Sequence, residues 1–123
     1  MENIVKHLGE YLTLNHDQAR SMPPEFYTSE EVFEVEQNRL FRREWACLGR
    51  IQQIPKAGDY FATALMNEPL IVVRTKPSEI RVLSNVCRHR GTVLVEGSGN
   101  TKSFTCPYHA WSYNLDGELR RAP

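Results

Sequence analysis

Two short stretches of the chain each place a thiol close to an imidazole. "VCRHRG" contains Cys87 and His89, and "TCPYHAW" contains Cys106 and His109. Sixteen residues, 90–105, separate the C-x-H pair from the C-x-x-H pair. Thiolate and imidazole are good ligands for zinc and for iron–sulfur clusters. Because a tight loop curls around a metal, donors one or two residues apart can point at the same centre.

Four kinds of chemistry use these residue types: a disulfide, a structural zinc site, a cysteine nucleophile with a histidine base, and an iron–sulfur cluster. An odd count of three cysteines disfavours a disulfide framework, and the duplicated pairs disfavour a nucleophile. The common zinc finger has two cysteines in one pair and two histidines in the other. Here each pair holds one of each, which favours a two-iron cluster with both cysteines on one iron and both histidines on the other. Zinc remains the alternative.

The composition indicates one modest globular chain without an electrostatic partner surface. Of 123 residues, 41% are apolar and 24% are charged, and the charges balance to zero. Neither nucleic acid nor a membrane is therefore an expected partner. "MENIVKHLGEYL" lacks the basic start and apolar run of a signal peptide, so we expect a cytoplasmic protein. Hydrolase and nucleotide-binding motifs are absent from the sequence, and we assign no catalytic residue.

The first third of the chain shows helical patterns. A helix is expected over residues 3 to 13, where the apolar stripe is Ile4, Val5, Leu8, Tyr11 and Leu12. "SMPPEF" then interrupts the helical pattern, which defines an N-terminal helical arm over 1–25 and a second domain over 26–123. Thr28 and Glu31 form a capping box for a helix over 29–44, with Phe33, Leu40, Phe41 and Trp45 on one face.

After Trp45 the sequence consists of short runs rich in β-branched and aromatic residues, separated by turn signals. The runs predict a mainly β fold, an antiparallel sandwich or small barrel, with strands at 45–53, 59–65, 70–75, 80–84, 101–105, 110–114 and 118–121. Each Cys/His pair follows a predicted strand, so both pairs should lie on loops at strand ends. Cys47 is expected in the core, and His7 and His16 are expected to face solvent.

The sequence resembles the Rieske 2Fe-2S proteins, and among them the α subunits of Rieske non-haem iron oxygenases of the ring-hydroxylating type. The resemblance is carried by "PPEFYTSEEVF", "REWACLGRI", "PKAGDY", "EPLIVVR", "NVCRHRG" and "CPYHAWSYNLDGELR", and covers nearly the whole chain. It implies that Cys87, His89, Cys106 and His109 ligate a Rieske 2Fe-2S cluster. The cluster would pass electrons to a mononuclear iron in a C-terminal catalytic domain that these residues do not include.

The resemblance also implies partners. A reductase or ferredoxin would donate electrons, and the catalytic domain of a neighbouring subunit in a homo-oligomer would accept them. The substrate would be a small organic molecule that is hydroxylated or demethylated, with aromatic acids and quaternary ammonium compounds both open. The alternatives are a stand-alone Rieske ferredoxin-like carrier, which would lack the helix containing "FEVEQNRLFRREW", and, from another class, a zinc-stabilised binding module.

Residues beside the proposed ligands suggest how the cluster would be tuned. Arg88 and Arg90 place positive charge next to the first pair, and Trp111 and Tyr113 are expected to cover the cluster from solvent. Trp111 carries no hydroxyl donor, which in this family implies a low reduction potential. The sequence departs from the family at Ala110, where the oxygenases usually have glycine.

Overall fold

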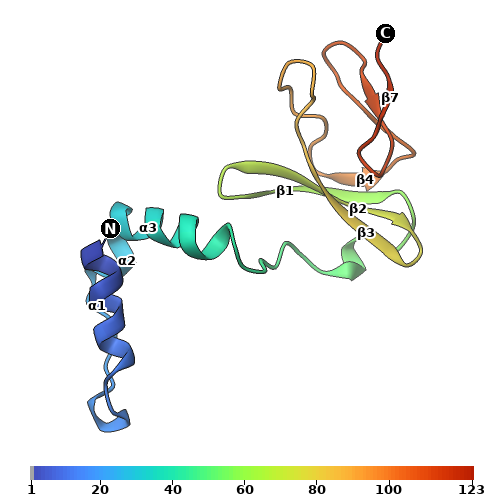
Figure 1. The fold of residues 1–123 in the computed structure, drawn as a ribbon. Coiled ribbons are helices and arrows are strands. Elements are labelled where there is room, and N and C mark those ends of the chain that lie inside the picture. Colours follow the sequence, from blue (N-terminus) through green and yellow to red (C-terminus); the bar gives the residue numbers. More distant parts are fainter. Residues whose placement is uncertain (1) are drawn as a thin grey trace. The chain divides into compact units, whose positions relative to one another are not determined.

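The computed structural model describes residues 2–123, and the side chains of Glu2, Asn3 and Val5 lie outside that description. The chain forms two compact units, Met1–Ala46 and Cys47–Pro123, which are drawn in Figure 1 and are described separately below. The expected boundary between residues 25 and 26 stays a prediction. Within residues 2–123, no helix combines the length and the apolar character needed to cross a bilayer.

The first unit is helical. It contains α1 (Glu2–Leu12), a 3-10 turn η1 (His16–Gln18), α2 (Glu25–Thr28), α3 (Glu30–Glu36) and a π-helical turn η2 (Gln37–Phe41). The helix predicted over residues 3 to 13 is confirmed, although the part of its stripe formed by Val5 lies outside the described side chains. Phe26, Val32 and Val35 form the small buried core, and the ring of His7 packs edge-on against Phe26 with centroids 5.6 Å apart.

Two details of the second predicted helix are wrong. The residue that caps α3 is Ser29, whose hydroxyl accepts a hydrogen bond from the Val32 N–H at 3.4 Å. Thr28 instead belongs to α2, and its hydroxyl donates to the Pro24 carbonyl at 3.3 Å. The helix also ends before residue 44, because the α-helical pitch gives way to the wider turn η2 (Gln37–Phe41).

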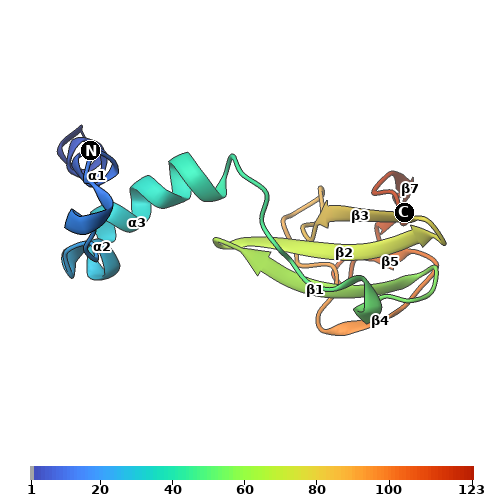
Figure 2. The ribbon, with the colours of Figure 1, turned by 90° about the horizontal axis from the view of Figure 1, so that it is seen from below.

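The second unit is mainly β, as the sequence predicts. One sheet has the order β3-β2-β1-β4 and the other the order β5-β6-β7, and every pairing is antiparallel. The strands are β1 (Asp59–Leu65), β2 (Glu68–Lys76), β3 (Glu79–Ser84), β4 (Ser98–Asn100), β5 (Phe104–Thr105), β6 (Ser112–Tyr113) and β7 (Leu119–Arg121). Figure 2 shows the long strands β1 to β3 lying side by side.

The strand predicted over residues 45–53 is wrong. Instead of a strand, this run ends in a 3-10 turn, η3 (Ile51–Gln53), in which the Gln53 side chain accepts a hydrogen bond from the Arg50 N–H at 2.7 Å. Cys47 is exposed rather than part of the core, which corrects the expectation for this thiol. Strand β4 was not predicted, because its glycine-rich sequence favours a turn.

The core of the second unit lies under the two Cys/His pairs. It comprises Ile71, Val73, Cys87, Leu94, Phe104, Cys106 and Tyr113. Buried Asn85 fixes the chain that enters and leaves the first pair, since its side chain accepts hydrogen bonds from the N–H groups of Leu94 and Val95 and donates to the Val95 carbonyl. Both cysteines are therefore held by the same apolar core that joins the two sheets.

Asp59 at the start of β1 gives a testable contribution to stability. Its carboxylate accepts hydrogen bonds from the Asn100 side chain at 2.8 Å and from the Lys56 N–H at 2.7 Å. The bond from Asn100 first, and then that from Lys56, lowers the pKa of Asp59 below its ordinary value of 3.8. A carboxyl group whose pKa is lower in the folded than in the unfolded state stabilises the fold at pH values above the unfolded-state pKa. This stabilisation is lost as the pH falls through the folded-state pKa.

We therefore expect Asp59→Asn to lower the free energy of unfolding at neutral pH, and the deficit to shrink in acid. Urea unfolding followed by circular dichroism across the acidic range measures it. Glu96→Gln is a matched control, since the described structure shows no hydrogen bond to this exposed carboxylate. A deficit that is the same at neutral and acidic pH would contradict the assignment to the charged carboxylate.

Candidate metal centre

The first Cys/His pair lies on a tight loop that follows β3. The Cys87 carbonyl accepts a hydrogen bond from the Gly91 N–H at 2.9 Å, and the Cys87 N–H donates to the Thr92 carbonyl at 2.8 Å. An isolated β-bridge between Val86 and Val93 closes the base of the loop. These bonds fold the loop back on itself, as expected for a pair of donors that share one centre.

The second pair, which follows β5, repeats the same backbone pattern. The Cys106 carbonyl accepts from the Ala110 N–H at 3.1 Å, and the Cys106 N–H donates to the Trp111 carbonyl at 2.8 Å. In both loops the residue four positions after the cysteine closes the turn. Only the histidine differs in position, at the second place after Cys87 and at the third place after Cys106.

The closing residue of each loop adopts a left-handed backbone conformation. Gly91 has φ 70° and Ala110 has φ 58°. Glycine takes this conformation freely, whereas a side chain at positive φ crowds the following carbonyl. Ala110 thus keeps the turn that the usual glycine would form, but with backbone strain.

These two positions permit a paired test of that strain. We expect Ala110→Gly to raise the free energy of unfolding and Gly91→Ala to lower it, each by about 1 kcal/mol. A methyl group at Gly91 would meet no heavy atom within 4 Å, so its cost isolates the backbone term. Urea unfolding of both variants gives the two values, and changes of the same sign would contradict the strain at Ala110.

The two thiols lie inside the protein, side by side. Cys87 is 2% exposed and Cys106 is 3% exposed, and both are free. Burial alone raises the pKa of the Cys87 thiol, but hydrogen bonds from Tyr113, from the His89 N–H and from Cys106 outweigh it and lower that pKa below its ordinary value. The surroundings of Cys87 therefore favour the thiolate, which is the form that binds metals.

The Tyr113 side chain contacts a cysteine sulfur directly. Its hydroxyl oxygen lies 3.3 Å from the Cys87 sulfur and accepts a hydrogen bond from the Arg88 N–H at 3.0 Å. Since the oxygen accepts from Arg88, its own proton is free to point at the sulfur. Burial raises the pKa of Tyr113 above its ordinary value of 10.0, so the hydroxyl keeps this proton at neutral pH. The sequence indicated Tyr113 as a cover for the site but did not reveal this bond.

The two histidines lie on the outside. Both imidazoles are exposed, and their ring centroids are 4.8 Å apart. The Trp111 ring stacks on His89 at 4.8 Å with an angle of 7°, and the Tyr108 ring contacts His109 at 3.7 Å. Tyr108 was not singled out by the sequence pattern. The site therefore pairs buried sulfur with exposed nitrogen across two loops.

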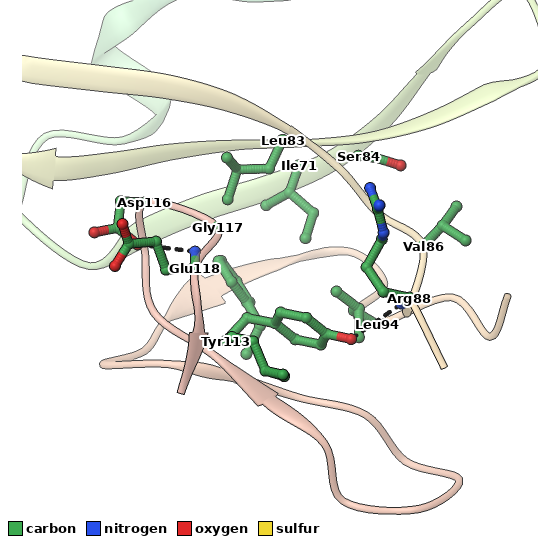
Figure 3. A pocket seen from close by; sticks show the side chains of 12 residues that line it. Ile71, Leu83, Ser84, Val86, Arg88, Leu94, Tyr113, Asp116, Gly117 and Glu118 are labelled. Atoms are coloured by element: carbon green, nitrogen blue, oxygen red, sulfur yellow. Dashed lines mark hydrogen bonds between the residues drawn. The ribbon is translucent and has the colours of Figure 1, made fainter. Parts of the chain in front are cut away.

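A cavity of about 590 Å³ lies between the larger sheet and β6–β7 (Figure 3). Its lining is mostly apolar, with Ile71, Leu83, Leu94 and Phe104 among the contributors. Tyr113 lies in its wall and Arg88 at its edge, whereas none of the four proposed ligands lines it. Tyr113 therefore stands between this cavity and Cys87, and the donor pairs do not open into it.

The arrangement of donors fits a two-iron cluster. Within residues 2–123, no three side chains of histidine, cysteine, aspartate or glutamate gather closely enough to hold one metal ion. A Rieske cluster requires only two protein ligands for each iron. The buried cysteine pair and the exposed histidine pair have the residue types that such a cluster uses, with the thiols on one side and the imidazoles on the other.

Four other candidate residues are exposed. His7 and His16 are exposed in the first unit, as the sequence predicts. Arg88 and Arg90 are exposed beside the first pair, and neither guanidinium forms an ion pair within the described residues. The two arginines therefore leave positive charge at the surface next to the histidines.

The second unit is a small antiparallel β domain in which two similar loops each carry a cysteine and a histidine. Residues 44–123 match the family model of the Rieske [2Fe-2S] domain. The chain therefore belongs to the Rieske [2Fe-2S] domain family, whose cofactor is a 2Fe-2S cluster.

Relatives with curated names are oxygenase subunits. The chain is 43% identical over 116 residues to the α subunit of benzene 1,2-dioxygenase from Pseudomonas putida. The aligned residues cover 94% of this chain and 26% of that relative. It is 40% identical over 119 residues to the oxygenase subunit of carnitine monooxygenase from Acinetobacter baumannii, which covers 96% of this chain and 32% of the relative. The chain thus spans about a quarter to a third of the length of these relatives.

Solved structures show the same fold. Naphthalene 1,2-dioxygenase from a Rhodococcus species, bound to indole, superposes with a TM-score of 0.86 at 34% identity, over 100% of this chain and 28% of that chain. The quaternary ammonium Rieske monooxygenase CntA, in complex with an inhibitor, gives a TM-score of 0.79 at 40% identity, over 85% of this chain and 29% of that chain.

Proposed function

We propose that Cys87, His89, Cys106 and His109 hold the Rieske cluster, with the cysteines on an inner iron and the histidines on an outer iron. The observation that carries this proposal is the separation of donors into a buried thiol pair and an exposed imidazole pair. When bound, the cluster supplies a one-electron couple. The protein residues exclude water from the sulfur side and leave the histidine side at the surface, where an electron partner can approach.

The chain would act as the redox domain of an oxygenase. Electrons would come from a reductase or ferredoxin and leave toward a mononuclear iron in the catalytic domain of a neighbouring subunit of a homo-oligomer. The names of the relatives support this role, since they include dioxygenase α subunits and a monooxygenase oxygenase subunit. Their named substrates, benzene and carnitine, keep both aromatic and quaternary ammonium compounds as candidate substrate classes.

Metal analysis and spectroscopy of the purified chain test the proposal. A Rieske cluster gives about two iron atoms and two acid-labile sulfides per chain, a brown colour, and an electron paramagnetic resonance signal after reduction. A zinc-stabilised binding module would be colourless and contain neither iron nor sulfide. Stoichiometric zinc in a folded, colourless protein from iron-replete cells would overturn the cluster assignment.

A further inference from the structure

An unbroken series of four aromatic rings crosses the exposed side of the metal centre. Trp111 stacks on His89, His89 makes a tilted contact with His109, and His109 contacts Tyr108. The successive centroid distances are 4.8, 4.8 and 3.7 Å. Each histidine therefore touches the other histidine and one further aromatic ring, and the two outer rings close the series at both ends.

An exposed histidine needs such contacts if it is to present one nitrogen to a metal. The torsion that turns an imidazole about its own axis is broad and roughly two-fold, so the backbone alone does not fix the ring plane. Metal-binding histidines commonly gain this fixation when the second ring nitrogen donates a hydrogen bond. Within residues 2–123, neither His89 nor His109 makes a side-chain hydrogen bond, and ring contacts are their visible restraint.

We propose that Tyr108 and Trp111 are positioning residues, each of which fixes the ring plane of one proposed ligand through ring contact. Trp111 serves His89, with nearly parallel rings at 7°, and Tyr108 serves His109, with the closest ring contact of the series. The centroid distance of the Trp111–His89 pair lies in the range that aromatic pairs favour. This inference rests on the proposed ligand set and concerns the ring of Tyr108, since its contact with His109 is made by the ring.

The placement of the two aromatics follows from the different spacing of the loops. Tyr108 occupies the extra position that the second loop has between its cysteine and its histidine. Trp111 follows Ala110, and its carbonyl is held by the Cys106 N–H at 2.8 Å. The second loop thus supplies both outer rings, one for its own histidine and one for the histidine of the first loop.

Tyr108→Ala in the cluster-loaded chain is the primary test, because Tyr108 is 59% exposed and its removal should not unfold the core. We expect altered nitrogen hyperfine couplings of a histidine ligand in pulsed electron paramagnetic resonance. Cluster loss to a chelator should accelerate about two- to tenfold, the range that one aromatic contact supports. Tyr108→Phe should restore both properties. Tyr27→Ala, which removes another exposed tyrosine, is the matched control.

The outcomes separate this inference from the proposed function. If the parent chain shows no histidine nitrogen couplings, the ligand assignment fails and the inference fails with it. If the parent shows them and Tyr108→Ala leaves both couplings and chelator loss unchanged, only the positioning role is overturned. Trp111→Ala, with Trp111→Phe as its rescue, repeats the test for His89.

Discussion

The His109→Ala variant is expected to lose the visible and electron paramagnetic resonance spectra of a Rieske cluster and to keep its β fold. The outer iron would retain one of its two protein ligands, and a site with an open position on an exposed iron is not expected to hold the cluster. The imidazole of His109 is exposed, so its loss leaves the buried core of the second unit in place. The same result is expected for His89→Ala.

Two control variants make this prediction specific. His16→Ala removes an exposed histidine of the first unit, and Cys47→Ser removes the exposed thiol outside the donor pairs. Both should show the spectra of the parent chain, and circular dichroism should confirm that all variants are folded. Native spectra in His109→Ala would remove that histidine from the site, and loss of the cluster in Cys47→Ser would assign Cys47 a role that its position does not suggest.

The placement of each Cys/His pair on a loop at a strand end could be predicted from the sequence because this information is local. Two residues that are one or two positions apart on a short loop stay close in any fold, and turn signals flank both loops. The hairpin from β1 to β2 was predictable for the same reason. Its two-residue turn has positive φ at both Met66 and Asn67, the geometry that suits a tight hairpin.

The errors in the strand predictions arise where distant residues decide the structure. Gly99 allows β4 to lie against Tyr60, since a methyl group there would come within 3.2 Å of the Tyr60 hydroxyl, and no local pattern predicts that pairing. Gly49 packs against Phe61 in the same close manner, so this position lies next to a side chain of β1 without belonging to a strand. Both errors concern glycines whose role depends on a tertiary neighbour.

The bond between Tyr113 and Cys87 was missed for a related reason. Twenty-six positions separate the two residues, and their packing in one shared apolar core brings the hydroxyl to the sulfur. The sequence places Tyr113 next to the second loop, whereas the structure connects it to the first. The expectation of a low potential, which rests on the resemblance and on the missing hydroxyl at Trp111, therefore has to take the Tyr113 hydroxyl into account.

Tyr113→Phe is expected to lower the reduction potential of the cluster. A hydrogen bond to a ligating sulfur stabilises the reduced state more than the oxidised state, because the reduced cluster carries more negative charge. A difference of about 1 kcal/mol between the two states corresponds to roughly 40 mV for a one-electron couple. The substitution also leaves the Arg88 N–H without its acceptor, which adds a small loss of stability.

Redox titration followed by circular dichroism or electron paramagnetic resonance measures the shift. Tyr108→Phe is the matched control, since it deletes a hydroxyl from an exposed tyrosine for which no hydrogen bond to either cysteine is found in the described structure. Its potential should equal that of the parent chain. Tyr113 lines the cavity in Figure 3, so removal of its hydroxyl also makes room for water next to Cys87. Such a water would replace part of the missing hydrogen bond. A potential of Tyr113→Phe that equals or exceeds the parent value would show that the tyrosine hydroxyl does not stabilise the reduced cluster.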